Sequence, residues 1–204
     1  MGVFTQIRKD AFEQIQADTG ILLKNLDPET GTYQNEDIIT TTSGGITVNC
    51  TPTYSDWGED IDNVPNNMKE FKHLDAWECT VETTAIDTSA EMIRIALGSA
   101  DIDGTEITPR ASLKQTDFTD LWWVGDKIGG GLVACKVINA LSTGGLSLKT
   151  GKNEKGQMSI TLTGHVSINN QDVMPMKFYS TDAPTENDTE TVSLTKYDDT
   201  PEEI

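Results

Sequence analysis

The sequence predicts an α+β protein that is mainly β, a β-sandwich or partly closed barrel flanked by one short helix and preceded by an N-terminal helix. Hydrophobic residues make up only 36% of the 204 residues and glycines number 17, which favours short strands and turns over helix packing. Alternating apolar and polar residues recur along the chain, whereas one internal segment carries both a start and a stop signal for a helix. We expect this domain to span residues 1–180.

A helix is predicted at the N-terminus, within residues 1–18, because apolar residues there recur at helical spacing. The apolar stripe consists of Phe4, Ile7, Ala11, Phe12 and Ile15, and Gly20 follows it as a stop. A helix of this length is marginal alone, so its stripe must be buried against the protein's own sheet or against a neighbouring subunit.

Strands are predicted in both halves of the chain. Residues 21–24 form the first, and a turn containing Asp-Pro and a glycine follows it. Apolar and polar side chains alternate over residues 46–54 and again over residues 77–82, so two strands bracket an acidic loop. Later strands are predicted at 130–141, 145–151, 156–168 and 173–180.

The internal helix is predicted within DTSAEMIRIALG, residues 87–98. Thr88 and Glu91 have the spacing of a capping box, and Gly98 supplies the C-terminal stop. This helix is short, so we expect it to lie against a sheet.

Two adjacent tryptophans, Trp122 and Trp123, lie on opposite faces if residues 119–126 form a strand. One ring must then be covered by something outside the sheet, because a large apolar side chain is rarely left in water. The cover is a helix, a loop or another subunit.

The stretch SDWGEDIDN, residues 55–63, raises the question of a metal or catalytic site. It carries four carboxylates, which are Asp56, Glu59, Asp60 and Asp62. Oxygen-rich loops with a glycine suit calcium, and paired carboxylates suit acid–base catalysis. Neither this stretch nor the second acidic loop, SADIDG, matches an EF-hand template. The preferred interpretation is a solvated connection between two strands.

No catalytic, cofactor-binding or metal-ligating residues are predicted, and we expect the protein not to be an enzyme. His73 and His165 are not at a zinc-ligand spacing from a cysteine or carboxylate. Cys50, Cys79 and Cys135 fall on apolar strand positions, which is typical of packed and inert thiols. The string GGLSLKTGK lacks the spacing and the final Ser or Thr of a phosphate-binding loop.

The net charge of −18 argues against binding to DNA or to anionic membrane, because both require Lys and Arg to replace counterions. Three widely separated cysteines suit a reducing compartment. We expect synthesis in the cytosol, since no signal peptide or membrane span is recognisable. Residues 181–204 hold eight acids and one lysine, which predicts a flexible acidic tail.

Six strings are informative together. They are FEQIQADTGILLKNLDPETG, TPTYSDWGEDIDNVPNNMKE, ADIDGTEITPR, FTDLWWVGD, INALSTGGLSLKTG and KGQMSITLTGH. In their order and spacing they resemble the major tail proteins of long, non-contractile-tailed bacteriophages and of related prophages in Gram-positive gut bacteria. The resemblance covers most of residues 12–180.

The resemblance implies a structural virion protein in which six copies form a ring and rings stack into the tail tube, the conduit for DNA ejection. The implied partners are further copies of the chain and the tape measure, tail terminator and distal tail proteins. DNA passes through without specific binding, and neither a membrane nor a cofactor is involved. Some tail tube proteins carry an extra immunoglobulin-like domain, for which residues 181–204 are too few.

Candidate assembly residues come from the N-terminal helix, from the loop between Ser55 and Lys72, and from the tryptophan pair. They are Phe4, Ile7, Phe12, Trp57, Asp60, Asp62, Phe71 and Trp122. The alternative function is a calcium-dependent carbohydrate-binding β-sandwich module, with Trp57, Trp122 or Trp123 as a sugar platform. A hydrolase with a carboxylate pair is the third hypothesis.

Overall fold

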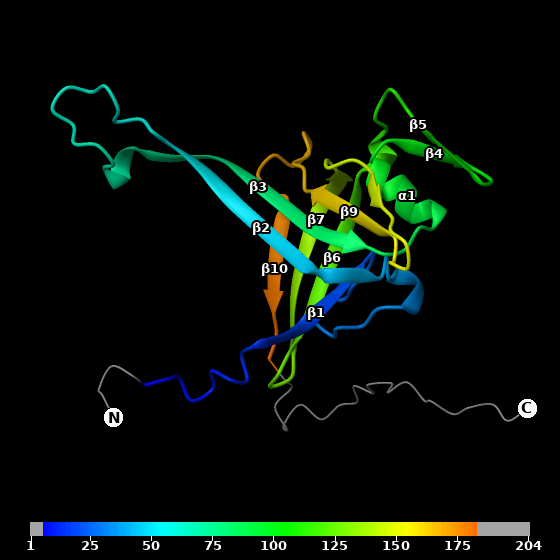
Figure 1. Cartoon of the computed structure of the whole chain (residues 1–204). Coiled ribbons are helices and arrows are strands. Elements are labelled where there is room, and N and C mark those ends of the chain that lie inside the picture. The colour runs from blue at the N-terminus through cyan, green and yellow to red at the C-terminus, as the bar shows by residue number, and fades with distance from the viewer. Residues whose placement is uncertain (1–5, 183–204) are drawn as a thin grey trace, which may run out of the picture.

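A computed structural model describes residues 6–182, and the fold of this part of the chain is mainly β (Figure 1). Eight strands form one antiparallel sheet with the order β1-β6-β7-β9-β3-β2, in which β10 also pairs with β7 and β8 with β9. Two further strands, β4 and β5, form a small separate hairpin beside the helix α1. The mainly β fold and the single short α-helix of the described part agree with the sequence prediction.

The strands of the large sheet differ greatly in length. They are β1 (Gln16–Leu23), β2 (Thr42–Asp56), β3 (Lys72–Ala85), β6 (Thr119–Lys127), β7 (Leu132–Ser142), β8 (Ser147–Lys149), β9 (Gln157–Thr163) and β10 (Met176–Ser180). The small hairpin consists of β4 (Ala100–Asp103) and β5 (Glu106–Pro109), and α1 spans Ala90–Leu97. Three single 3-10 turns lie at η1 (Asn35–Asp37), η2 (Lys69–Phe71) and η3 (Gln115–Asp117).

The long strand β7 joins the two halves of the sheet. Its residues 133–137 pair with both β6 and β10, whereas residues 141–142 pair with β9. Between these segments Asn139 has a left-handed backbone with φ 48°, and its N–H donates to Asp120 Oδ1 at 3.0 Å. In Figure 1 the β2 and β3 strands consequently run diagonally across β6, β7 and β10.

The main core lies between the two halves and under α1. Its fully buried members include Leu22 and Leu121 from one half, Val81 and Leu162 from the other, and Met92 from the helix. The β-sandwich or partly closed barrel predicted from sequence is therefore replaced by one continuous bent sheet, and the described strands form no closed barrel. Because β7 belongs to both halves, the sheet covers its own core without separating into two sheets.

The helix α1 begins and ends nearly where its sequence signals predict. The cap is Ser89, whose hydroxyl accepts from the Met92 N–H at 3.3 Å, and not the neighbouring Thr88. Gly98 ends the helix with φ 73° and donates its N–H to the carbonyls of Arg94 and Ile95.

The predicted N-terminal helix is wrong for the described residues. Residues 9–14 form turns, and β1 begins at Gln16. The Ile128 and Gly129 N–H groups donate to the carbonyls of Ile15 and Glu13, both at 2.9 Å, so this segment is held to the end of β6. The stripe is left unburied, with Ile7 82% and Phe12 67% exposed. Residues 1–5, including Phe4, lie outside the described part.

Two other boundaries differ from the sequence prediction. Strand β9 ends at Thr163, not at residue 168. The Gly164 N–H still donates to the Cys79 carbonyl on β3, but the His165 N–H turns away to the Ile138 carbonyl on β7. The predicted flexible tail, residues 181–204, lies outside the described residues except for its first two.

A close backbone contact in β1 yields a stability prediction. Gly20 has φ 69°, and a Cβ there would collide with the Val124 carbonyl and lie 2.8 Å from Trp123 Nε1. Gly20→Ala is expected to lower the free energy of unfolding by about 3 kcal/mol or more, measured by urea denaturation. Gly45→Ala is the matched control, because Gly45 also has positive φ (92°) but open space around it. That variant should lose only about 1 kcal/mol, and equal losses in the two variants would contradict the steric explanation.

Candidate assembly surface

A two-stranded arm extends from the large sheet. We define the arm as residues 51–78, in which the outer halves of β2 and β3 pair with each other from Thr51 and Glu78 out to Asp56 and Lys72. Strand β9 supports β3 only from Thr80 inward. Within the described chain, the arm therefore has two free edges, and Figure 1 shows it projecting away from the body.

The arm is not stabilised by the usual means of a sheet. An isolated two-stranded hairpin is marginally stable in water, since it lacks a third strand or a layer packed on its face. Its free N–H and C=O groups also form a template for pairing with another chain. Both properties make the arm a candidate for contact with another segment or another molecule.

The tip of the arm carries a stacked aromatic pair. The Trp57 ring lies 4.3 Å from the His73 ring, centroid to centroid, at an interplanar angle of 11°. The backbone N–H of Trp57 donates to the backbone carbonyl of Phe71 at 2.9 Å, and this bond closes the loop at its base. Because Trp57 is 64% exposed, only one ring face is covered by His73. The other face is available to a neighbouring molecule.

Two carboxylates shape this tip through hydrogen bonds. Asp56 accepts from the N–H groups of Asn67 (2.8 Å) and Gly58 (2.9 Å), and these bonds hold the pKa of Asp56 below its usual value. Asp75 lies 2.9 Å from His73 Nδ1 and accepts from the Ser55 hydroxyl, so the pKa of Asp75 is lowered as well. The first acidic stretch thus has an ordering role at Asp56.

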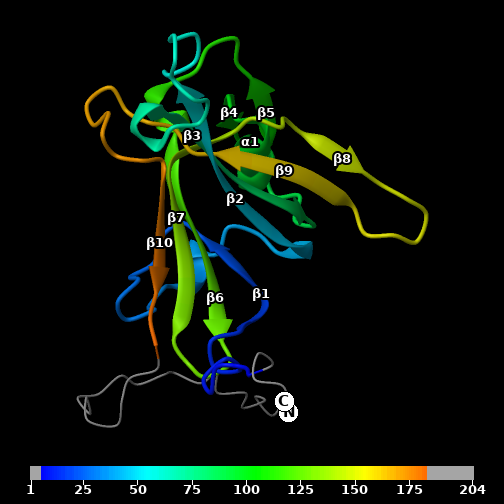
Figure 2. The ribbon, with the colours of Figure 1, turned by 90° about the vertical axis from the view of Figure 1, so that its left-hand side faces the viewer.

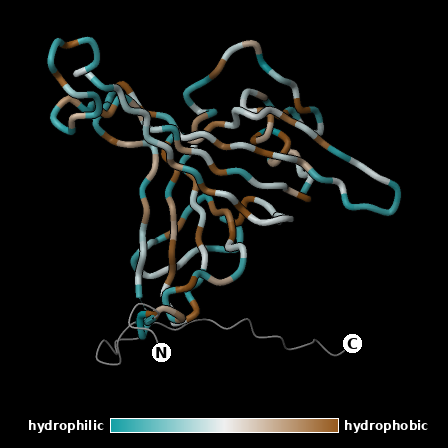
Figure 3. Tube along the Cα trace, turned by 60° about the vertical axis from the view of Figure 1, so that its left-hand side comes forward, coloured by the Kyte–Doolittle hydropathy of each residue, from teal (hydrophilic) through white to brown (hydrophobic). Residues whose placement is uncertain are grey.

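Further apolar side chains on the arm were not identified from the sequence. Tyr54 and Leu74 are cross-strand partners, and both are exposed. The sequence pattern places Tyr54 on the face of the strand that is expected to be buried. In the structure Tyr54 lies on the part of β2 that projects past the core, so its side chain is exposed. In Figure 3 brown hydrophobic segments alternate with teal ones along the arm. The alternation at 46–54 carried no signal for this exposure, because the structure extends β2 to 15 residues, Thr42–Asp56, well beyond the predicted strand.

The charge of the arm is strongly acidic. Residues 51–78 contain seven carboxylate side chains and two lysines. Glu59, Asp60 and Asp62 are all exposed in the loop, and Asp60 has a positive φ of 66°. An apolar contact at this tip is therefore surrounded by negative charge, so the part of a partner surface that covers the tip must itself carry few carboxylates.

The segments near the two ends of the described chain meet at another part of the body, away from the arm (Figure 2). The Lys127 ammonium, whose side chain is 6% exposed, lies 3.0 Å from Asp182 Oδ1 and donates to Gln14 Oε1 at 3.3 Å. Gln14 also donates to Asp182, and the hydrogen bond from Lys127, followed by that from Gln14, lowers the pKa of Asp182. We call Gln14, Lys127 and Asp182 the terminal cluster.

Trp122 and Trp123 contact different clusters, as expected for opposite faces of β6. Trp122 is 7% exposed and packs with Leu26 and with the ring of Tyr179 at 5.3 Å. Trp123 packs against the main core and donates its indole N–H to the Thr19 carbonyl at 3.0 Å. The cover over Trp122 includes the loop after β1, so this ring offers little surface to another subunit.

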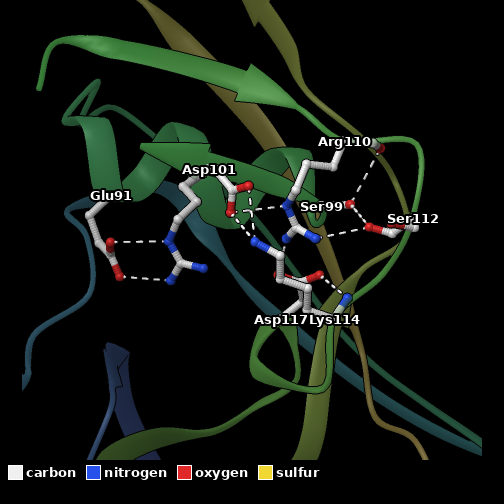
Figure 4. A network of polar contacts seen from close by, with 8 residues as sticks. Glu91, Ser99, Asp101, Arg110, Ser112, Lys114 and Asp117 are labelled. Carbon is white, nitrogen blue, oxygen red and sulfur yellow. Dashed lines mark hydrogen bonds and ion pairs between the residues drawn. The ribbon is translucent and has the colours of Figure 1, made fainter. Parts of the chain in front are cut away.

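The second acidic loop forms the β4–β5 hairpin, and its Asp101 is paired with cations of the chain (Figure 4). Lys114 Nζ donates to Asp101 at 2.9 Å, and Arg110 Nε lies 3.0 Å away without alignment for a hydrogen bond. Hydrogen bonding from Lys114 lowers the pKa of Asp101. Arg110 also pairs with buried Asp117, which ties the hairpin to η3.

A hollow of about 510 Å³ lies between the loop after β1 and strands β6 and β7. Its two carboxylates are already bonded within the loop. Asp27 accepts from the Glu29 N–H and the Thr30 hydroxyl, and Asp37 accepts from the Gln34 N–H. These contacts are those of turn and cap residues. No group of three His, Cys, Asp or Glu side chains in residues 6–182 has a geometry that suits a metal ion.

The structure separates the candidate residues into four groups. The arm loop holds Trp57, Asp60, Asp62 and Phe71. The exposed segment before β1 holds Ile7 and Phe12. Trp122 lies in a core cluster, and Phe4 is outside the described residues. The arm loop is therefore the strongest candidate surface, and the exposed segment before β1 is a second one.

No protein-family model matches this chain, and no curated protein matches it. In residues 6–182, no helix has the length and apolar character needed to span a membrane.

The bonds to Asp56 yield a pH prediction. The pKa of Asp56 is lower in the folded chain than its ordinary value of 3.8, so these bonds are fully present above about pH 4 and are lost as the pH falls through the folded pKa. The amide signals of Gly58 and Asn67 should shift together in NMR spectra, with a midpoint below pH 3.8. Asp56→Asn should abolish this shared titration; a midpoint at or above 3.8 would exclude the proposed ordering role.

Proposed function

We propose that this protein is a structural, self-assembling virion protein that forms hexameric rings stacked into a bacteriophage tail tube. The observation that carries the proposal is the arm, a two-stranded ribbon with free edges and an exposed aromatic tip. The resemblance of the sequence strings to tail tube proteins supplies the ring number, the stacking and the role in DNA ejection.

The arm supports self-assembly for an energetic reason. Burial of apolar surface contributes roughly 25 cal/mol per Å², and Trp57, Tyr54 and Leu74 hold such surface in water. A monomer gains nothing from this exposure, whereas a second copy that covers the tip removes it. The open face of Trp57 is the central contact in the proposal, because tryptophan is enriched among residues that dominate binding energy.

The position of the second exposed surface supports head-to-tail contacts. Ile7 and Phe12 lie in the segment before β1, which leaves the body at the terminal cluster and not at the arm (Figure 1). Different surfaces that meet between identical subunits generate rings when the rotation closes and filaments when it does not. Stacked rings require both kinds of contact, so two separate surfaces suit a tube better than a simple dimer.

The acidic balance is compatible with a DNA conduit. Duplex DNA carries one negative charge per about 1.7 Å, and the net charge of the chain is −18. Carboxylates facing a passing duplex repel it, which permits sliding without specific binding. The carbohydrate-binding alternative loses one of its sugar platforms, since Trp122 is packed into a core cluster.

Removal of the arm loop tests the proposal directly. Asp56 and Lys72 are the last paired residues, so residues 57–71 can be replaced by Asn-Gly, which closes a two-residue hairpin turn. The variant is expected to fold but to stay monomeric at concentrations at which the full-length chain forms rings or tubes. Negative-stain electron microscopy and analytical ultracentrifugation measure both outcomes. A full-length chain that stays monomeric at high concentration would contradict self-assembly itself.

A single substitution tests the tip. Trp57→Ala should leave the thermal unfolding midpoint within a few degrees, because the ring packs on one exposed side chain only, and should reduce ring formation at least tenfold. Trp57→Phe keeps an aromatic face and should retain most assembly. Tyr33→Ala removes another exposed aromatic ring outside the arm and serves as the matched control. Unchanged assembly of Trp57→Ala would exclude the tip as the contact.

A further inference from the structure

The three cysteines, far apart in the sequence, converge at the root of the arm. Cys79 and Cys135 are fully buried members of the main core, and Cys50 is half-buried against it. Cys50 on β2 and Cys79 on β3 are direct cross-strand partners. The sequence prediction of inert, separately packed thiols did not include this pairing.

The pair occupies the type of site in which opposite side chains come closest. Pairs in an antiparallel ladder alternate between hydrogen-bonded and non-hydrogen-bonded sites. The Cys79 carbonyl accepts from the Gly164 N–H at 3.0 Å, so it points toward β9 and away from Cys50. Pro52, which has no N–H to donate, faces Trp77 two residues further out, at a site of the same type. Cys50 and Cys79 therefore form a non-hydrogen-bonded pair.

This geometry suits a disulfide. Opposite residues of a non-hydrogen-bonded pair have Cα atoms about 4.5 Å apart, inside the range of about 4.4–6.8 Å that a disulfide spans. Their side chains also share one face of the ribbon, because directly opposed residues point the same way. The third thiol, Cys135, comes from β7 on the other half of the sheet.

We propose that Cys50 and Cys79 form a dithiol that small-molecule disulfides oxidise to an intramolecular cross-strand disulfide at the root of the arm. Cys50 Sγ, as thiolate, attacks one sulfur of the small disulfide and releases one small thiol. Cys79 Sγ then attacks Cys50 Sγ and releases the second. The two protons of the protein thiols end on the two released thiolates, so the protein loses two hydrogens and one small disulfide is reduced.

The surroundings determine which thiol reacts first. Burial, together with the neighbouring Cys50 thiol, raises the pKa of Cys79 to about 12, and burial also raises the pKa of Cys135 to about 12. Because the thiolate is the nucleophile, these two buried thiols react slowly with reagents in solution. Cys50 has exposed surface, so the first exchange takes place there, and Cys79 reacts only with the sulfur already beside it.

The proposed disulfide would lie at the point where β9 stops pairing with β3 and the two-stranded arm begins. Cys79 is the outermost residue of β3 that is bonded to the segment after β9, and the free ribbon begins at the next pair, Thr51 and Glu78. A cross-link between β2 and β3 at this point prevents the two strands from separating at the root. Oxidation therefore clamps the base of the arm and leaves the tip unchanged.

The test uses the wild-type chain with cystamine, a small cationic disulfide suited to an acidic protein, at about pH 9 to favour thiolate formation. Titratable thiols in the denatured protein should fall from three to one, and the intact mass should decrease by two hydrogens. Trypsin places the three cysteines on separate peptides, which span residues 25–69, 73–94 and 128–136. The first two should be joined.

Two variants complete the experiment. Cys135→Ala should form the same bond, leaving no free thiol, because Cys135 takes no part in it. In Cys50→Ser, both remaining thiols should stay free. The oxidised wild type should unfold several degrees higher than the reduced form, and Cys50→Ser should show no such shift. Three free thiols after oxidation, a bond to Cys135, or a lasting cysteamine adduct on Cys50 would each overturn the proposal.

Discussion

The change of partner along β7 is the constraint on which the rest of the structure depends. At Asn139 the backbone enters the left-handed region, which asparagine tolerates better than most residues, and Asp120 satisfies its N–H. Beyond this residue β7 no longer pairs with β10, keeps one pair with β6 between Ala140 and Thr119, and joins β9 from Leu141 onward. The two halves of the sheet therefore turn toward each other. This bend encloses the core. It also determines where β9 ends, and therefore where β3 loses β9 as a pairing partner.

The arm exists because β9 stops pairing with β3 before the β2–β3 ladder ends. Strands β2 and β3 have thirteen register pairs, but β9 pairs with only the inner six residues of β3. The body therefore provides the base. The outer ribbon is held by the β2–β3 hydrogen bonds, by the stack of Trp57 on His73 and by the bonds of Asp56 within the loop. In the proposed function, contact between copies is made by this outer ribbon, which the body does not cover.

Local signals predicted local structure well. The helix from Ala90 to Leu97 was predicted because its cap and its glycine stop lie within a few residues of it, and Ser89 replaces Thr88 as cap because either hydroxyl can serve. The N-terminal helix was wrongly predicted because Glu13 and Ile15 accept from the N–H groups of Gly129 and Ile128, more than 100 residues away. A local periodicity carries no information about such a distant partner. For the same reason the strand prediction at 46–54 could not show that its outer half leaves the core. The Trp57 and His73 stack and the convergence of the cysteines depend on the β2–β3 register, which the sequence pattern alone does not specify.

The terminal cluster has a consequence for how the body can be isolated. A buried ammonium is stable only with a counter-charge, and Asp182 is the ion-pair partner of Lys127. The neighbouring Thr181 donates its N–H to the Leu132 carbonyl, and its hydroxyl accepts from the Leu132 N–H. The first two residues of the acidic C-terminal segment thus belong to the folded body. A recombinant boundary set at residue 180, where β10 ends, would remove the exposed carboxylate that pairs with the buried Lys127, whereas one set after Asp182 retains it.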